Sequence, residues 1–180
     1  MTRYHKTPKL IVGFARRPHP EYWSLMTIYY KLRYGLMTTI LTNEDIIAYK
    51  KLNVRGKRVL DGGAFIGDTA QLFLKWGAAE VFCVEQNPEY ASRIKTPNTT
   101  VFPEKFSRKH LELPWEVLKL DIEEYELEML PYLKNERRPM VVEVHGLYSL
   151  ECFQKAGFVP LNKIAPPGFC IVGKNLEGVA

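Results

Sequence analysis

Short apolar runs alternate along this chain with longer segments that carry helix-start and helix-stop signals. The apolar runs predict β-strands at 58–61, 80–85, 99–102, 117–120 and 140–144. Helices are expected at 42–51, 67–76, 124–133 and 147–155, with a short one opened by Asn87-Pro88. This alternation predicts a doubly wound, Rossmann-like α/β fold, with a mostly parallel sheet and helices on both faces.

The C-terminal segment departs from the alternation. Residues 158–164 and 169–172 have the pattern of two strands in a hairpin around Pro166-Pro167-Gly168. That hairpin would complete a seven-stranded sheet with an antiparallel C-terminal edge strand. A length of 180 residues suits one compact domain of this kind, which we assign to residues 43–180.

The first 42 residues form a basic extension that we treat as a candidate lid. Residues 21–34 predict a helix that ends at Gly35, after an irregular, proline-containing start. Residues 1–60 hold 12 Lys and Arg against 3 Asp and Glu, a net charge of +9, whereas the whole chain carries +5. A basic first third can meet an anionic partner such as RNA, a nucleotide-sugar or a lipid headgroup, or it can be a solvated surface.

Composition narrows the class of protein. No apolar run approaches the length of a membrane-spanning helix, and no apolar segment that would make a secretory signal follows the basic N-terminus. The three cysteines, Cys83, Cys152 and Cys170, are scattered and form neither a metal clip nor a disulfide framework. We therefore expect a cytoplasmic protein without a metal site.

The segment Arg58-Val-Leu-Asp-Gly-Gly-Ala-Phe-Ile-Gly-Asp-Thr69 carries the most specific chemical signal. An apolar strand runs into a carboxylate, a glycine-rich turn and a helix start. The next strand ends at Glu85, which follows Asp61 by 85 − 61 = 24 residues. An acidic residue at about this spacing binds ribose hydroxyls in nucleotide-binding folds, so the pair predicts a nucleoside cofactor site. The alternative is a tight turn after a buried strand.

The charges in this segment distinguish between cofactors. The dinucleotide pattern is degraded, because Ala64 stands where its second glycine belongs. Asp61 and Asp68 would repel a pyrophosphate, by up to about 4 kcal/mol at a few ångströms and intermediate dielectric. S-adenosylmethionine has no phosphate and carries a sulfonium and an ammonium group. Two carboxylates therefore favour S-adenosylmethionine.

Four ordered motifs resemble those of class I S-adenosylmethionine-dependent methyltransferases, and of the FkbM family in particular. They are 59–69, 84–89, 118–126 and 141–146; the family's versions include Ile-Gly-Asp-Thr, Glu-Pro-Asn-Pro, Lys-x-Asp-Ile-Glu-Gly-x-Glu and Glu-x-His. Gln86 and Glu124 depart from the usual proline and glycine. The resemblance implies methylation of a hydroxyl on a small molecule or glycan, with S-adenosylhomocysteine as the second product.

The resemblance also implies cofactor contacts, position by position. Gly63 and Gly67 would surround the methionine moiety, and Asp61 would face its ammonium side. Glu85 would hold the ribose hydroxyls. The complete set of expected cofactor-binding residues is Asp61, Gly62, Gly63, Ala64, Gly67, Asp68, Thr69, Glu85, Gln86 and Asn87.

Polar residues at the carboxyl ends of two further strands are the candidates for catalysis. Asp121 and Glu123 follow the fourth strand, and Glu143 and His145 end the fifth. Carboxyl ends of parallel strands meet at one edge of a sheet, where ligands bind. His145 is the expected general base, since the pKa of an unperturbed histidine is about 6.5. Asp121 or Glu123 would bind the acceptor, orient it or accept its proton, and Glu143 would orient His145. The alternative is ordinary helix capping.

Two other functions stay open from the sequence. The basic first third, with Trp23, Met26, Tyr30 and Tyr34 near helical spacing, fits an RNA methyltransferase with a base-stacking platform, although such residues also serve as core or lid packing. A non-catalytic S-adenosylmethionine-binding module fits the short segment between the third and fourth strands. Neither the methyl acceptor nor the oligomeric state follows from the sequence.

Overall fold

The structure is a computed structural model, and it describes residues 41–123, 125–164 and 169–176. The expected helix at 21–34, nearly all of the candidate lid and the turn at Pro166-Pro167-Gly168 lie outside the described residues. Within the described part, no helix is long and apolar enough to cross a membrane.

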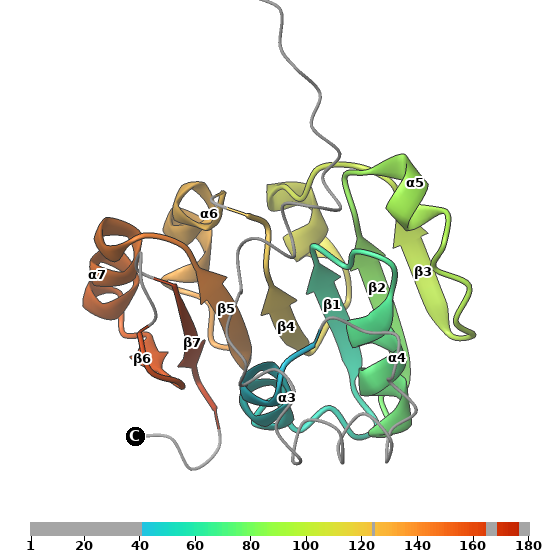
Figure 1. Ribbon diagram of the computed structural model, residues 1–180, viewed down its shortest axis with the longest axis horizontal. Helices are drawn as coiled ribbons and strands as arrows, with labels where there is room; N and C mark the ends of the chain where they lie inside the picture. The colour runs from blue at the N-terminus through green and yellow to red at the C-terminus, as the bar shows by residue number, and fades with distance from the viewer. Residues whose placement is uncertain (1–40, 124, 165–168, 177–180) are drawn as a thin grey trace, which may run out of the picture.

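A seven-stranded sheet in the order β3-β2-β1-β4-β5-β7-β6 forms the centre of the fold (Figure 1). The strands are β1 (Arg58–Gly62), β2 (Glu80–Val84), β3 (Thr99–Phe102), β4 (Val117–Leu120), β5 (Met140–Val144), β6 (Val159–Pro160) and β7 (Cys170–Lys174). The strands β1 to β5 pair in parallel, and β7 is antiparallel to both β5 and β6. This confirms the predicted fold class.

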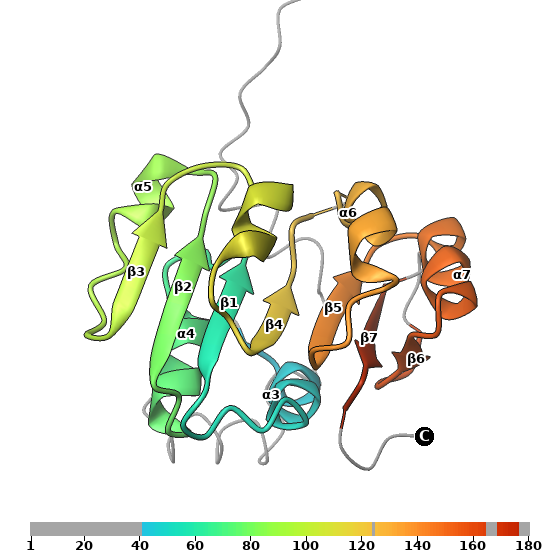
Figure 2. The same cartoon turned by 180° about the vertical axis from the view of Figure 1, so that it is seen from behind.

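Helices cover both faces of the sheet. They are α3 (Asn43–Lys50), α4 (Asp68–Lys75), α5 (Pro88–Ala91), the 3₁₀ helix η2 (Arg108–Glu112), α6 (Glu126–Leu133) and α7 (Leu147–Lys155). One hydrophobic cluster joins α3 and α4 to one face of the sheet, and a second joins α6 and α7 to the other (Figures 1 and 2). Successive strand residues divide between the clusters, as in Val59 and Leu60 of β1.

Side-chain caps explain where two helices begin. At α3, the Thr42 hydroxyl accepts a hydrogen bond from the Asp45 N–H (3.2 Å), and the Asp45 carboxylate accepts one from the Thr42 N–H (2.7 Å). This is the reciprocal capping box. At α5, the Asn87 carbonyl oxygen accepts a hydrogen bond from the Glu89 N–H (2.9 Å). Both helix starts confirm the positions expected from the sequence.

The structure differs from the prediction at three places. Helix α6 begins at Glu126 rather than at position 124, because Glu123 has the left-handed φ of 54° and interrupts helical geometry. Strand β6 is confined to Val159–Pro160, since proline has no N–H to extend the ladder. Helix η2 was not predicted, because its residues show no hydrophobic periodicity. A local hydrogen bond closes its first turn, from the Ser107 N–H to His110 Nδ1 (3.0 Å).

Candidate functional site

The loop after β1 is pressed against the end of β4. Gly63 has φ +74°, and a Cβ at this position would lie 1.6 Å from the carbonyl oxygen of Asp121. The Gly63 and Ala64 N–H groups donate to the Val84 carbonyl oxygen (2.9 and 3.1 Å), which ties the loop to β2 as well. Only glycine satisfies both the backbone conformation and the close approach at position 63.

Asp61 is held by two partners and has no exposure to solvent. Lys119 Nζ of β4 lies 3.0 Å from Asp61 Oδ1, and the Thr69 hydroxyl donates to Asp61 Oδ2 (2.5 Å). Lys119 also donates to the Gly63 carbonyl oxygen (2.9 Å). Burial lowers the pKa of Lys119, but the Asp61 and Asp121 carboxylates outweigh it and raise this pKa above its usual value. Lys119 is therefore a buried, charged residue that binds both Asp61 and the backbone of the loop.

This arrangement gives Asp61 and Thr69 a structural contact that the sequence did not indicate. Both side chains are buried, and the hydrogen bond between them helps to shape the loop. Their contact with the cofactor stays a prediction. The repulsion of a pyrophosphate that we expected from Asp61 is offset by Lys119. The sequence could not show this, because it did not indicate which strand lies beside β1.

Asp68 is the loop carboxylate that remains available. It is buried at the start of α4, and its Oδ1 accepts a hydrogen bond from the Thr69 N–H (3.0 Å). Its Oδ2 has no hydrogen-bond partner among the described residues. Burial is the largest influence on Asp68 and raises its pKa. Asp68 lines a pocket of about 400 Å³ together with Gly67, Gln71, Arg93 and Lys95.

Glu85 lies directly after β2 and connects the two expected cofactor segments. Its Oε2 accepts a hydrogen bond from the Phe65 N–H (2.9 Å), and its Oε1 accepts one from the Asn87 N–H (2.7 Å). Because a carboxylate has about four acceptor positions, each oxygen keeps one for a ligand hydroxyl. Gln86 is exposed beside it, whereas the Asn87 side chain is used as the cap of α5.

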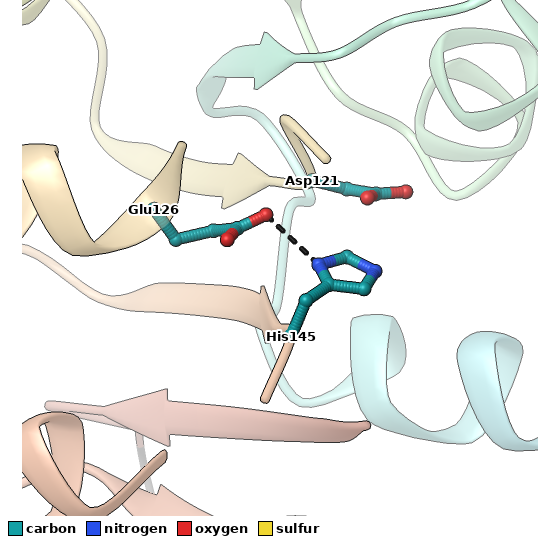
Figure 3. Close-up of side chains that lie close together, drawn as sticks. All are labelled: Asp121, Glu126 and His145. Carbon is teal, nitrogen blue, oxygen red and sulfur yellow. Dashed lines mark hydrogen bonds and ion pairs between the residues drawn. The ribbon is translucent and has the colours of Figure 1, made fainter. Parts of the chain in front are cut away.

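A second polar cluster lies at the carboxyl ends of β4 and β5, where the sequence placed catalysis. His145 Nδ1 is 3.0 Å from Glu126 Oε1 (Figure 3), and its Nε2 is 3.7 Å from Glu143 Oε1. Asp121 is half-buried, and its Oδ1 is shielded from solvent without a hydrogen-bond partner among the described residues. Glu123 is exposed.

The environment of this cluster shifts two pKa values. Burial is the largest influence on Asp121 and raises its pKa to about 6, against the opposing effect of Lys119. Burial lowers the pKa of His145, but the hydrogen bond and charge of Glu126, with Asp121 and Glu123, outweigh it and raise this pKa above its usual value. The neighbouring carboxylates therefore favour the protonated form of the His145 imidazole.

The cluster also contains a set of atoms that could hold a metal ion. One ligand atom each from Asp121, Glu126 and His145 lie within 4.8 Å of one another. Cysteine spacing does not indicate such a set, and its three residues come from different elements of the fold. His145 and Glu126 already form a hydrogen bond in this arrangement.

Sequence reasoning missed Lys119 and Glu126 as site residues. Both belong to the motif at 118–126, as its second and last residues. Lys119 is also the one charged residue within the run 117–120, and an isolated lysine in a buried strand is a signal for a paired charge. Glu126 has no comparable signal in hydrophobic periodicity.

No family model matches the chain, and no curated protein matches it. The FkbM resemblance therefore rests on the four motifs alone. Solved structures do match, at low sequence identity. Precorrin-6y C5,15-methyltransferase from Geobacter metallireducens GS-15 aligns with a TM-score of 0.57 and 14% identity, covering 76% of this chain and 92% of that chain.

Two further matches are similar in extent. The tRNA (m1A58) methyltransferase TrmI from Aquifex aeolicus has a TM-score of 0.53 and 20% identity, covering 78% of this chain and 72% of its own. Fibrillarin from Aeropyrum pernix, crystallised with S-adenosyl-L-methionine, has a TM-score of 0.51 and 13% identity, covering 79% and 73%. This chain has the Rossmann-like fold that these methyltransferases share.

Proposed function

We propose that this protein is an S-adenosylmethionine-dependent methyltransferase that modifies a hydroxyl group on a small molecule or glycan. The observation that carries the proposal is Glu85, which two backbone N–H groups hold at the end of β2, against the glycine loop. A fixed, buried carboxylate with free acceptor positions suits the two hydroxyls of a ribose.

The residues of the loop fit the proposed cofactor. Gly63 lets the loop pack directly against the end of β4, and Asp68 Oδ2 offers a buried acceptor to an ammonium group. Glu85 would hold the ribose, with Gln86 beside the adenine. When bound, this cofactor supplies an electrophilic methyl group. Fibrillarin, a protein of the same fold, is crystallised with S-adenosyl-L-methionine, which supports the choice.

We place the methyl acceptor beside the His145 cluster. His145 is partly exposed, with 18% of its side-chain surface accessible, so an acceptor hydroxyl can reach it. His145 would accept the hydroxyl proton, and Asp121 would bind or orient the acceptor. Glu143 lies 3.7 Å from Nε2, too far for a hydrogen bond, but its charge stabilises the protonated ring. The choice of a hydroxyl follows from the FkbM resemblance.

The first experiment is calorimetric titration of the full chain with S-adenosylmethionine and, separately, with NAD. We expect binding of the former in the micromolar range and none of the latter. NAD binding would overturn the cofactor assignment. NAD is the relevant competitor because Lys119 neutralises Asp61, the carboxylate that we expected to repel a pyrophosphate. Release of S-adenosylhomocysteine from a panel of hydroxyl compounds then tests for transfer. Binding without transfer to any acceptor would support the non-catalytic module instead.

An RNA methyltransferase is the second candidate. It is favoured by the charge of +9 on residues 1–60 and by the similarity in fold to a tRNA methyltransferase. Binding through phosphates weakens steeply with salt. Because we propose a small molecule or glycan as the acceptor, we expect a fluorescent RNA to bind this chain weakly. The affinity for RNA should then change little with salt concentration. Tight binding that falls about a thousandfold between 50 and 200 mM salt would favour the RNA acceptor.

A further inference from the structure

We propose that Glu126 is a positioning residue, which holds His145 so that its Nε2 is directed to the proton of the acceptor hydroxyl. The proposal rests on the proposed function and goes beyond it, because Glu126 was not among the residues expected to act. It assigns the orientation of His145 to the first turn of α6, not to Glu143, its neighbour on β5.

The geometry of the pair supports this assignment. Glu126 Oε1 lies 3.0 Å from His145 Nδ1, which is hydrogen-bond distance, whereas Glu143 Oε1 lies 3.7 Å from Nε2. Only 1% of the Glu126 side-chain surface is accessible, so the carboxylate that meets the ring is kept from water. The Phe169 ring packs against His145 with centroids 5.6 Å apart and restricts the imidazole further.

The hydrogen bond determines which ring nitrogen carries the proton. A carboxylate accepts from an N–H, so neutral His145 keeps its proton on Nδ1, and Nε2 retains the lone pair. The contact of Nε2 with Glu143 Oε1 is 3.7 Å long and so exceeds hydrogen-bond distance. Nε2, on a partly exposed ring, is therefore the atom that can accept a proton from a ligand.

The charges around the ring support the same step. The charges of Glu126 of α6 and of Asp121 and Glu123 after β4 raise the pKa of His145, and Glu143 of β5 lies 3.7 Å from Nε2. When the acceptor proton moves to Nε2, the acceptor oxygen keeps the electron pair and the ring becomes an imidazolium. Glu126 then forms an ion pair with it at hydrogen-bond distance, which stabilises the charge that develops.

The test is nitrogen-15 NMR of the histidine side chains in the full chain, which needs no acceptor. We expect neutral His145 in the wild type to be protonated at Nδ1. Glu126→Gln keeps the shape but removes the charge, so the pKa of His145 should fall. Glu126→Ala should also raise the fraction protonated at Nε2. The matched control is Glu128→Gln, an exposed carboxylate on the same helix, which should leave both properties unchanged.

Several outcomes would overturn the proposal. One is wild-type His145 protonated at Nε2, and another is the same His145 pKa in Glu126→Gln as in the wild type. A third is Zn²⁺ or Mn²⁺ that binds at one equivalent and shifts the His145 signals in the wild type but not in Glu126→Gln, since Glu126 would then be a metal ligand. Failure of the proposed function is separate, because it would appear as absent S-adenosylmethionine binding.

Once an acceptor is known, kinetics provide a second readout. General-base catalysis contributes roughly 10²–10⁴-fold, so Glu126→Gln should lower kcat by about tenfold or more. The KM values for cofactor and acceptor should change little, because the buried Glu126 would contact neither. The acid side of the pH–rate profile should move to lower pH with the His145 pKa. A raised KM with unchanged kcat would make Glu126 a binding residue and contradict its positioning role.

Discussion

The ammonium group of Lys119 lies 3.0 Å from the carboxylate of Asp61, and neither side chain has more than 2% of its surface exposed. The two residues are direct neighbours across β1 and β4. Lys119 also binds the carbonyl oxygen of Gly63, so one charge joins the two central strands and the loop between β1 and α4. The pair therefore holds the loop of the proposed cofactor site against the sheet.

Breaking this pair should destabilise the fold strongly. Lys119→Met leaves the Asp61 carboxylate buried without its cation, and removal of one partner of a buried pair costs about 3–5 kcal/mol. Urea unfolding at pH 7 measures the loss. The double variant Asp61→Asn/Lys119→Met should be more stable than Lys119→Met alone. If the two variants are equally stable, the ion pair does not explain the effect.

Gly63 should be far less tolerant of alanine than Gly56. Both have left-handed φ angles, +74° and +71°, but a Cβ would meet the Asp121 carbonyl oxygen at 1.6 Å only at Gly63. We expect Gly56→Ala to cost about 1–2 kcal/mol from backbone strain. Gly63→Ala should cost more than about 3 kcal/mol, because overpacking adds to the strain. Comparable unfolding free energies would show that the loop moves aside easily.

Replacement of Glu85 should weaken cofactor binding. Glu85→Ala removes the carboxylate proposed to hold the ribose, and lost hydrogen bonds to a charged group correspond to about 1–3 kcal/mol. Calorimetry should therefore show a Kd for S-adenosylmethionine that is raised about 5- to 150-fold. Glu80→Gln, at the other end of β2, is the matched control and should bind normally. Unchanged affinity of a folded Glu85→Ala would remove Glu85 from the site.

Asp121 should make stability depend on pH. Its folded-state pKa of about 6 lies above the ordinary value of 3.8, so the folded protein binds this proton more tightly than the unfolded chain does. The resulting stabilisation is present below about pH 4 and is lost as the pH rises through 6. Asp121→Asn should therefore gain stability relative to the wild type as the pH rises.

The expected gain is roughly 1–3 kcal/mol at pH 7.5, and it should be near zero at pH 4. Unfolding free energies of both proteins at these two pH values give the measurement. The stability difference between variant and wild type at pH 7.5 is compared with the same difference at pH 4. An effect of the substitution that does not depend on pH therefore cancels. A difference that is independent of pH, or that falls as the pH rises, would contradict the assigned direction of the shift.

Much of the fold followed from the sequence, because its signals are local. The strands 99–102, 117–120 and 140–144 have the predicted bounds, since each apolar run is closed by polar or turn residues. The site was predictable only in outline. The strand ends locate Glu85, Asp121 and His145 at one edge, as the parallel pairing requires. What each of these side chains contacts was not predictable.

The side-chain contacts of the site were not predictable because the partners lie far apart in sequence. The ion pair of Asp61 with Lys119 depends on β4 lying beside β1, an order that no local pattern contains. The contact of Glu126 with His145 depends on Glu123, whose left-handed backbone delays the start of α6. Strand order and one unusual backbone angle therefore decide which carboxylate meets the histidine.

The missing side chain of Gly63 has a mechanical consequence for the two halves of the site. With no Cβ between them, the backbone of the first loop lies directly on the backbone of Asp121, and Lys119 holds the loop there from below. The surface proposed for the methyl donor and the surface proposed for its acceptor therefore meet at this backbone contact. Movement of the loop toward β4 would press on Asp121, so the proposed alignment of the two reactants would depend on packing that is already present without either of them.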